Sequence, residues 1–234
     1  MGSQRLPGKV LKDIIGRPML DLQIERLERV QNADQIIVAT SNHTSDDPLE
    51  EFCISKGYKC FRGSVNNVLN RFYQAALFAN ADTIVRVNGD CPLIDPEIIS
   101  SIIDFYTENK HKYDYCSNIL EDGFPIGLHT EVFSLNALSL AEAKSIDSIE
   151  REHVTPYIYR NPDLFRLYSY RSKYQLSNHR WTVDYEEDFK LVEKVYENLY
   201  PLNKNFGIFD VVDFLNTHPD IMNLNNHIKK LQTI

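Results

Sequence analysis

Two hydrophobic periodicities alternate along the first half of the chain. Short apolar runs that are typical of buried strands lie at residues 35–39, 58–61, 83–87 and 113–117. Segments whose apolar residues or end signals are typical of helices lie at residues 17–30, 46–57, 65–79 and 95–109. This alternation predicts an α/β fold, with a doubly wound, mostly parallel, Rossmann-like sheet covered by helices on both faces. In such sheets ligands bind beyond the carboxyl ends of the strands.

The pattern is less regular beyond residue 118. Strands are predicted at residues 131–134 and 165–169, and helices at residues 135–143, 149–160 and 186–199. No internal repeat, low-complexity tract or linker separates these segments. We therefore expect residues 1–234 to form a single domain, which is a common size for one α/β unit.

Composition narrows the class of protein. Hydrophobic residues make up 43% of the chain and aromatic residues 11%, enough to build a full core. The net charge of −8 argues against nucleic acid and anionic membranes as partners, although a local basic pocket remains compatible with it. The four cysteines form no C-x-x-C pair, and no secretory signal or long apolar run is present. We expect a cytoplasmic protein with reduced thiols.

The first nine residues, Met1-Gly2-Ser3-Gln4-Arg5-Leu6-Pro7-Gly8-Lys9, combine small residues with two cations. Gly2 and Ser3 allow the backbone to pass close to a ligand, whereas Arg5 and Lys9 place positive charge on the same loop. Backbone N–H groups together with two cations suit a polyphosphate. The alternative is that the segment is an ordinary solvated turn.

Two aspartates are candidate metal ligands. Asp90 directly follows the strand predicted at residues 83–87, and a carboxylate at that sheet edge can hold Mg²⁺, which prefers oxygen. The alternative is a strand-end turn stabilised by the same side chain. Asp184 has the spacing of a helix N-cap in a capping box with Glu187, and this interpretation requires no metal. Asp188, one turn further on, is expected on the helix surface.

Other polar residues follow predicted strands. Arg62, Gly63 and Ser64 lie between a strand and a helix and form a second candidate ligand edge, although Ser64 can simply cap that helix. Asn88 comes just before Asp90 and can face a base or ribose. Arg86 alternates with apolar neighbours, and its alternative role is to pair with a nearby acid.

Several of these segments carry a resemblance to a known family. They are Ser3-x-Arg5-Leu-Pro-Gly-Lys9, Phe61-Arg-Gly-Ser64, Arg86-Val-Asn-Gly-Asp90-Cys-Pro92, Phe124-Pro-Ile-Gly127-Leu, Glu150-Arg-Glu-His153 and Arg180-Trp-Thr-Val-Asp184. Together they resemble the SpsF-like (spore coat polysaccharide F) branch of the sugar-activating cytidylyltransferases, which is related to CMP-Kdo synthetase. The resemblance runs in order from the first residues to about residue 190, and it implies the nucleotide-diphospho-sugar transferase fold.

The resemblance assigns roles to individual residues. It implies catalytic roles for Arg5, Lys9 and Asp90, with Mg²⁺ held by Asp90 and Asp184. It places nucleotide contacts at Gly2, Ser3, Arg5, Lys9, Arg62, Gly63, Ser64, Asn88 and Asp90. It places acceptor contacts at Gly127, His129, Glu131 and His153, within or beside a small β extension at about residues 118–175 that supports a homodimer.

The chain departs from the family at two places. SpsF-like chains commonly carry an acidic residue where His129 stands and often where Ile126 stands, so we expect a different acceptor preference. Family members also begin with a hydrophobic strand directly before the Arg5–Lys9 loop, and Met1 here has the place of a mid-loop methionine. The expectation is a fold that lacks its central first strand, either because the true start lies upstream or because the protein is a degraded copy.

The resulting functional hypothesis is a CTP- and Mg²⁺-dependent nucleotidyltransferase. It transfers CMP to a sugar-like acceptor and releases pyrophosphate, for surface polysaccharide or glycan synthesis. Two alternatives remain: a glycosyltransferase that uses a preformed nucleotide sugar, and a non-catalytic nucleotide-binding remnant. The glycosyltransferase hypothesis is weakened because Asn88-Gly89-Asp90 lacks the first acid of an Asp-x-Asp motif.

Overall fold

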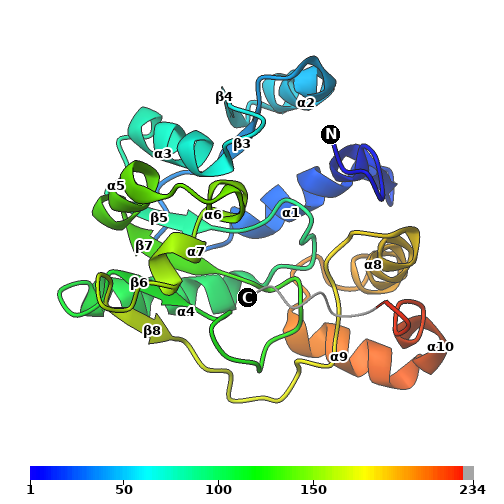
Figure 1. Cartoon of the computed structure of the whole chain (residues 1–234). Helices are drawn as coiled ribbons and strands as arrows, with labels where there is room; N and C mark the ends of the chain where they lie inside the picture. The colour runs from blue at the N-terminus through cyan, green and yellow to red at the C-terminus, as the bar shows by residue number, and fades with distance from the viewer. Residues whose placement is uncertain (229–234) are drawn as a thin grey trace.

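Strands of mixed direction form the centre of the molecule, and helices surround them (Figure 1). The computed structural model describes residues 1–228. A four-stranded sheet has the order β5-β7-β6-β8, with bounds Thr83–Arg86, Glu131–Ser134, Tyr115–Ser117 and Leu167–Ser169. A separate parallel pair joins β3 (Ile37–Ser41) to β4 (Lys59–Gly63). A short antiparallel hairpin joins β1 (Asp13–Ile14) to β2 (Arg17–Pro18).

The α/β class is confirmed, and the sheet is mixed. Strand β7 runs antiparallel to both of its neighbours, β5 and β6, whereas β6 and β8 are parallel. Because β5 and β6 both oppose β7, they run in the same direction, as do β3 and β4. In residues 1–228 no helix has the length and apolar character that crossing a membrane requires.

Helices account for most of the regular secondary structure in the described chain. Their bounds are α1 Met19–Leu27, α2 Asp47–Lys56, α3 Val68–Phe78, α4 Pro96–Asn109, α5 Leu135–Lys144, α6 Ser148–His153, α7 Pro156–Tyr159, α8 Glu186–Leu199, α9 Ile208–Thr217 and α10 Pro219–Met222. Two 3₁₀ turns, Lys9–Leu11 and Thr44–Asp46, precede α1 and α2. Helix α4 begins where the sequence predicts, because the Asp95 side chain accepts hydrogen bonds from the N–H groups of Glu97 and Ile98.

Three helices differ from their predicted extents for local reasons. Helix α1 begins at Met19 because Arg17 and Pro18 belong to β2. Helix α3 begins at Val68, where Asn67 is the N-cap, so Ser64 does not cap it. The helix predicted over residues 149–160 is divided into α6 and α7, since Val154 adopts a φ of 75° and Pro156 starts the second helix.

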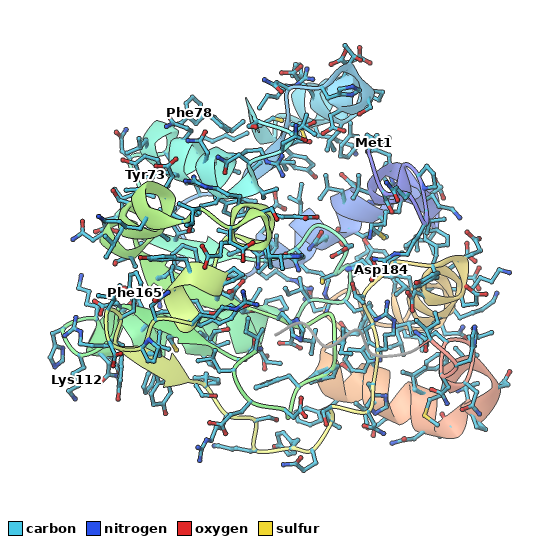
Figure 2. All side chains as sticks on the ribbon, in the orientation of Figure 1. Met1, Tyr73, Phe78, Lys112, Phe165 and Asp184 are labelled. Atoms are coloured by element: carbon cyan, nitrogen blue, oxygen red, sulfur yellow. The ribbon has the colours of Figure 1, made fainter. Side chains whose placement is uncertain are left out.

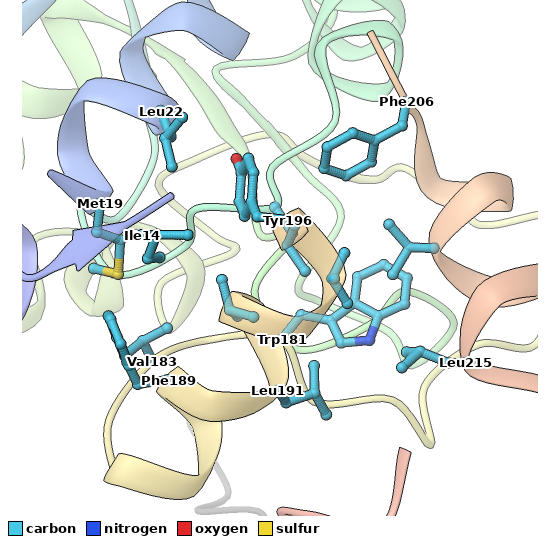
Figure 3. Close-up of a cluster of buried hydrophobic side chains, with 14 of the residues drawn as sticks. Ile14, Met19, Leu22, Trp181, Val183, Phe189, Leu191, Tyr196, Phe206 and Leu215 are labelled. Atoms are coloured by element: carbon cyan, nitrogen blue, oxygen red, sulfur yellow. The ribbon is translucent and has the colours of Figure 1, made fainter. Parts of the chain in front are cut away.

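The largest buried cluster lies where the N-terminal hairpin meets the C-terminal helices. Figure 3 shows Trp181 between side chains of α8 and α9, with Met19 and Leu22 of α1 at the opposite end of the cluster. Trp181 is 1% exposed and Phe189 3% exposed. This packing fixes the segment that leads into α8 against the first residues of the chain.

A cavity of about 730 Å³ separates β3 from β5. Within the described residues, β3 pairs only with β4, and β5 pairs only with β7. The lining comes from β3, the end of β5, and helices α1, α3 and α4, and includes Ile24, Val38, Val68, Val85 and Ile103. The cavity therefore lies between β3 of one sheet and the end of β5 of the other. The expected loss of a first strand remains a prediction.

Candidate functional site

Two aspartates from distant segments come together at one sheet edge. Asp90 lies in the loop that leaves β5, and Asp184 lies just before α8. The N–H of Val183 donates to the carbonyl oxygen of Asp90 over 2.8 Å, which joins the two segments through their backbones. The side chains are 27% and 16% exposed, so both remain accessible from outside. The predicted pair of carboxylates is thus brought together.

Lys9 lies between these two carboxylates. Its Nζ atom is 2.9 Å from Asp90 Oδ2, 3.1 Å from Asp184 Oδ1 and 2.6 Å from the carbonyl oxygen of Val183. Gly8, with a φ of 70°, precedes the 3₁₀ turn and directs the lysine inward. Burial lowers the pKa of Lys9, but the two carboxylates outweigh it and raise the pKa above its ordinary value. Lys9 is therefore a fixed cation at neutral pH.

Arg5 approaches Asp184 from the solvent side. Its guanidinium lies 2.9 Å from Asp184 Oδ1 and stacks over the Tyr185 ring at 5.1 Å. Figure 2 places Asp184 between the N-terminal loop and α8. The Arg5 side chain is 42% exposed, so it can turn toward a bound anion. Burial of Asp184 raises its pKa, but Lys9 and Arg5 hold the pKa below its ordinary value.

Arg180 holds the same aspartate from the protein side. It donates to Asp184 Oδ2 over 3.0 Å and makes two bonds to Asp188, at 3.0 and 3.1 Å. Asp188 is 1% exposed and accepts the N–H groups of Asp184 and Tyr185, so the expectation of a surface residue is wrong. The predicted capping box is also out of register, because Tyr185 is the N-cap and Asp188 is the third helical residue. This leaves Asp184 outside the helix, facing Lys9.

The oxygen atoms around Lys9 suit a divalent cation. Two carboxylates and a backbone carbonyl are hard ligands, and the Lys9 ammonium already occupies a cation's position among them. Residues 1–228 contain no group of three or more His, Cys, Asp or Glu side chains that could hold a metal. Mg²⁺ is commonly bound through one or two carboxylates plus substrate phosphates, so Asp90 and Asp184 fit it.

Gly127 and His129 lie in the loop that leads into β7. A Cβ atom on Gly127 would lie 2.6 Å from the Thr182 nitrogen, and its φ of 110° also favours glycine. The neighbouring Ile126 exchanges backbone hydrogen bonds with His179, Trp181 and Thr182. Burial lowers the pKa of His129, with the charges of Glu131, Arg86 and Asp90 also acting on it. His129 is therefore neutral at pH 7, and it lies close enough to Asp90 for the charge of that carboxylate to influence its pKa.

Glu131 is the first residue of β7 and belongs to a buried network. Its carboxylate accepts hydrogen bonds from Arg86, from Tyr115 at 2.7 Å and from Thr155 at 2.5 Å. It is 1% exposed, so neither oxygen is on an open surface. Arg86 therefore has the acidic partner that the sequence suggested as its alternative role. Two members of this network, Glu131 and Arg86, are close enough to His129 to shift its pKa.

The remaining nucleotide candidates lie apart from Lys9 or bind their own neighbours. Arg62 pairs with Asp47 at 2.7 Å and Glu50 at 2.6 Å, which ties the end of β4 to α2. Gly63 lets the Arg71 side chain pass, since a Cβ would lie 2.8 Å from it, and the Ser64 carbonyl accepts from Arg71.

Four further candidates have a clear local position. The hydroxyl of Ser3 accepts the Leu6 N–H over 3.3 Å and shapes the N-terminal loop. Gly2 and Asn88 line the cavity between β3 and β5, and the Asn88 carbonyl accepts from Gln23 over 2.7 Å. His153 is exposed at the end of α6. Val154 follows His153 and connects it to Thr155, whose hydroxyl donates to the Glu131 carboxylate.

Sequence reasoning missed Arg180, Asp188 and Asn225 as parts of this site. The Asn225 amide donates to Asp188 Oδ1 over 2.8 Å and to the Arg180 carbonyl over 2.9 Å. A signal for the first two was present, because the basic Arg180 is followed by the acidic Asp184 and Asp188 at intervals of four residues. Nothing in the local sequence identifies Asn225, which lies 37 residues beyond Asp188.

Comparison with known proteins agrees with this geometry. The family model described as cytidylyltransferase matches residues 1–209. The chain is 30% identical to the spore coat polysaccharide biosynthesis protein SpsF of Bacillus subtilis, covering 94% of this chain and 92% of that protein. A solved cytidylyltransferase from Leptospira borgpetersenii superposes with a TM-score of 0.90 at 32% identity, covering 100% of this chain and 94% of that one.

A more distant solved structure has the same fold. It is a CMP:2-keto-3-deoxy-manno-octonic acid synthetase complexed with CTP, with a TM-score of 0.62 at 16% identity, covering 85% of this chain and 95% of the other. The chain belongs to the cytidylyltransferase family. The resemblance to SpsF and to the CMP-Kdo synthetases is thereby confirmed, and the protein is an enzyme of that class.

Proposed function

We propose that this enzyme uses CTP and Mg²⁺ to transfer CMP to a sugar-like acceptor, releasing pyrophosphate. The observation that carries the proposal is the convergence of Arg5 and Lys9 on the Asp90–Asp184 pair. Nucleotidyl transfer needs cations for the triphosphate and carboxylates for a metal, and this one site contains both. The family name and the CTP complex of a protein with the same fold support the choice of nucleotide.

In the proposed reaction, an acceptor oxygen forms a bond to the α-phosphorus while the bond between that phosphorus and the bridging oxygen breaks. Pyrophosphate carries away the electron pair, and the acceptor hydroxyl gives up its proton to solvent water. Lys9 and Arg5 would bind the phosphates and stabilise the negative charge that develops on the departing pyrophosphate. Asp90 and Asp184 would hold the cation, which neutralises phosphate charge when bound.

The nucleotide and the acceptor would approach from different loops. We propose that Gly2, Ser3 and Asn88 contact the nucleotide, with Arg62, Gly63 and Ser64 forming the more distant part of the same edge. We place the acceptor beside Gly127 and His129, with His153 nearby. Glu131 would act beneath them by holding Arg86 and Thr155. Neutral His129 can either donate or accept a hydrogen bond, which suits the hydroxyl groups of a sugar.

The wider setting follows from the same proposal. The product would feed surface polysaccharide or glycan synthesis in the cytoplasm. The extension at about residues 118–175 would support a homodimer of this single-domain enzyme. Family membership favours nucleotidyl transfer over glycosyl transfer and over a non-catalytic remnant.

The direct test is pyrophosphate release with each of the four nucleoside triphosphates, Mg²⁺ and a panel of acceptors: 2-keto-3-deoxy sugars, sugar phosphates and alditols. We expect release only with CTP and one acceptor class. Release without CTP, or none with any acceptor from a folded protein that binds CTP, would contradict the proposal. Omission of Mg²⁺ and addition of a chelator should each abolish release.

A further inference from the structure

The contacts of Lys9 have a consequence for metal binding. Its ammonium group donates to three oxygen atoms, at 2.6, 2.9 and 3.1 Å, which uses the full donor capacity of a lysine. The side chain is only 11% exposed, so it is enclosed between the two loops. The carboxylate oxygens that it contacts, Asp90 Oδ2 and Asp184 Oδ1, are the ones that face each other across this gap.

We propose that Lys9 is a cation placeholder: it occupies the position between Asp90 and Asp184 that a divalent cation takes, and it must leave before that cation binds both carboxylates. This inference rests on the proposed function, because it takes these aspartates as the metal ligands. The phosphates of the nucleotide are the partners that draw Lys9 away. The free enzyme therefore binds metal weakly, and nucleotide strengthens metal binding.

Simple electrostatics requires the exchange. Mg²⁺ lies about 2.0–2.1 Å from its oxygen ligands, so it cannot share the facing oxygens of Asp90 and Asp184 with an ammonium at hydrogen-bond distance. Two cations a few ångströms apart also repel each other strongly in a partly buried site. The lysine has a flexible four-carbon stem and can swing toward phosphate oxygens without moving the backbone of the loop.

The aspartates keep their orientation when Lys9 moves. Arg180 donates to Asp184 Oδ2, the oxygen that Lys9 does not contact, and Arg180 is itself held by buried Asp188. The loop of Asp90 is held by its backbone bond to Val183. The carboxylates are thus preorganised, and Lys9 is the cation that exchanges between them; Arg5 also contacts Asp184 Oδ1, but it does so with a side chain that is 42% exposed and reaches only that one aspartate.

The test measures the metal alone, in the absence of nucleotide. Binding of Mn²⁺ is titrated by electron paramagnetic resonance for the wild-type chain and for Lys9→Met, which keeps the length of the side chain and removes its charge. We expect Lys9→Met to bind Mn²⁺ about tenfold more tightly, a change within the usual range for coupled sites. The matched control is Lys12→Met, because Lys12 pairs with Glu186 and contacts neither aspartate.

A second variant and two further substitutions separate the possible outcomes. Lys9→Gln keeps hydrogen-bond donors without the charge and should also bind Mn²⁺ more tightly; circular dichroism establishes that each variant is folded. If Asp90→Asn and Asp184→Asn leave Mn²⁺ binding unchanged, the proposed metal site itself is wrong. If both weaken binding but the two folded Lys9 variants bind no more tightly than wild type, or Lys12→Met tightens binding equally, the placeholder inference alone is overturned.

Discussion

The N–H of Val183 donates to the carbonyl oxygen of Asp90 over 2.8 Å, and this bond brings two distant parts of the chain into one site. It places the carboxylates of Asp90 and Asp184 on either side of Lys9. Since the bond is made by backbone atoms, substitution of either carboxylate leaves the two loops joined. Loss of chemistry and loss of folding can therefore be separated by experiment.

Asp90→Asn and Asp184→Asn should each lower kcat by about 100-fold or more, because each removes a charge that holds the cation near the phosphates. The thermal midpoint should change little in Asp90→Asn. Pyrophosphate release and a thermal melt measure the two effects. The control is Asp163→Asn, an exposed carboxylate after α7; a kcat within about twofold of wild type for both site variants would contradict the assignment.

Arg180→Met should lower the free energy of unfolding by about 3–5 kcal/mol, because it leaves Asp188 buried and without its counterion. Arg180→Lys should recover part of that loss, since it keeps the charge but not the planar fork of donors. Urea denaturation measures both values. The control is Lys194→Met, which breaks the exposed ion pair of Lys194 with Glu197. The interpretation fails if the two substitutions lower the free energy of unfolding equally.

Glu131→Gln should lower the free energy of unfolding by about 3–5 kcal/mol, because Arg86 loses the carboxylate that compensates its burial. Tyr115→Phe removes one neutral donor to the same carboxylate and should cost only about 1 kcal/mol. The pair of variants is compared by chemical denaturation. A Glu131→Gln protein that is as stable as wild type, but has a raised KM for the acceptor, would instead assign the residue to direct acceptor contact.

The stability of the protein should depend on pH through His129. Burial lowers the pKa of this histidine in the folded chain, so the unfolded chain binds a proton first as the pH falls. Stability is therefore retained above the ordinary histidine pKa of about 6.5 and lost as the pH falls below it. His129→Asn should flatten the profile between about pH 5 and 7 in denaturation measurements. His153→Asn, a change at an exposed residue, is the control; an unchanged slope in His129→Asn would refute this origin.

Filling the cavity between β3 and β5 should raise the thermal stability of the protein. A chain extended before Met1 by about six apolar, β-branched residues, roughly one typical strand, should melt at a higher temperature. The added residues would cover the apolar lining of the cavity, which Met1 and Gly2 already border. An extension of equal length made of Gly and Ser is the control. Equal melting temperatures for the two extended chains would show that the cavity does not accept a strand.

The elements that depend on local signals could be predicted from the sequence. Helix α4 begins at Pro96 because Asp95 caps it, and α8 spans the predicted residues Glu186–Leu199. The direction of β7 could not be predicted, because its period of two is the same in parallel and antiparallel pairs. The break at Val154 depends on tertiary packing of a fully buried side chain at a positive φ.

The site was predictable in its parts and less so in its connections. Arg5, Lys9, Asp90 and Asp184 each had a local signal, and the structure joins them. The N-cap of α8 is Tyr185, one residue later than predicted. The sequence rule accepts either Glu187 or Asp188 as the acidic third residue of the helix, and the ion pair with buried Arg180 favours Asp188. The contact of Asn225 with this group depends on how the C-terminal segment packs, which no local pattern records.

Gly127 has a consequence for how this enzyme can be redesigned. A Cβ atom on this residue would lie 2.6 Å from the Thr182 nitrogen, so no side chain fits, and the backbone of the loop packs directly against the segment that leads to Asp184. Mutational libraries aimed at a new acceptor should keep this residue fixed and vary positions that flank it, such as Ile126 and His129. If this loop contacts the acceptor as proposed, the side chains that flank Gly127 would set acceptor preference while the backbone stays fixed.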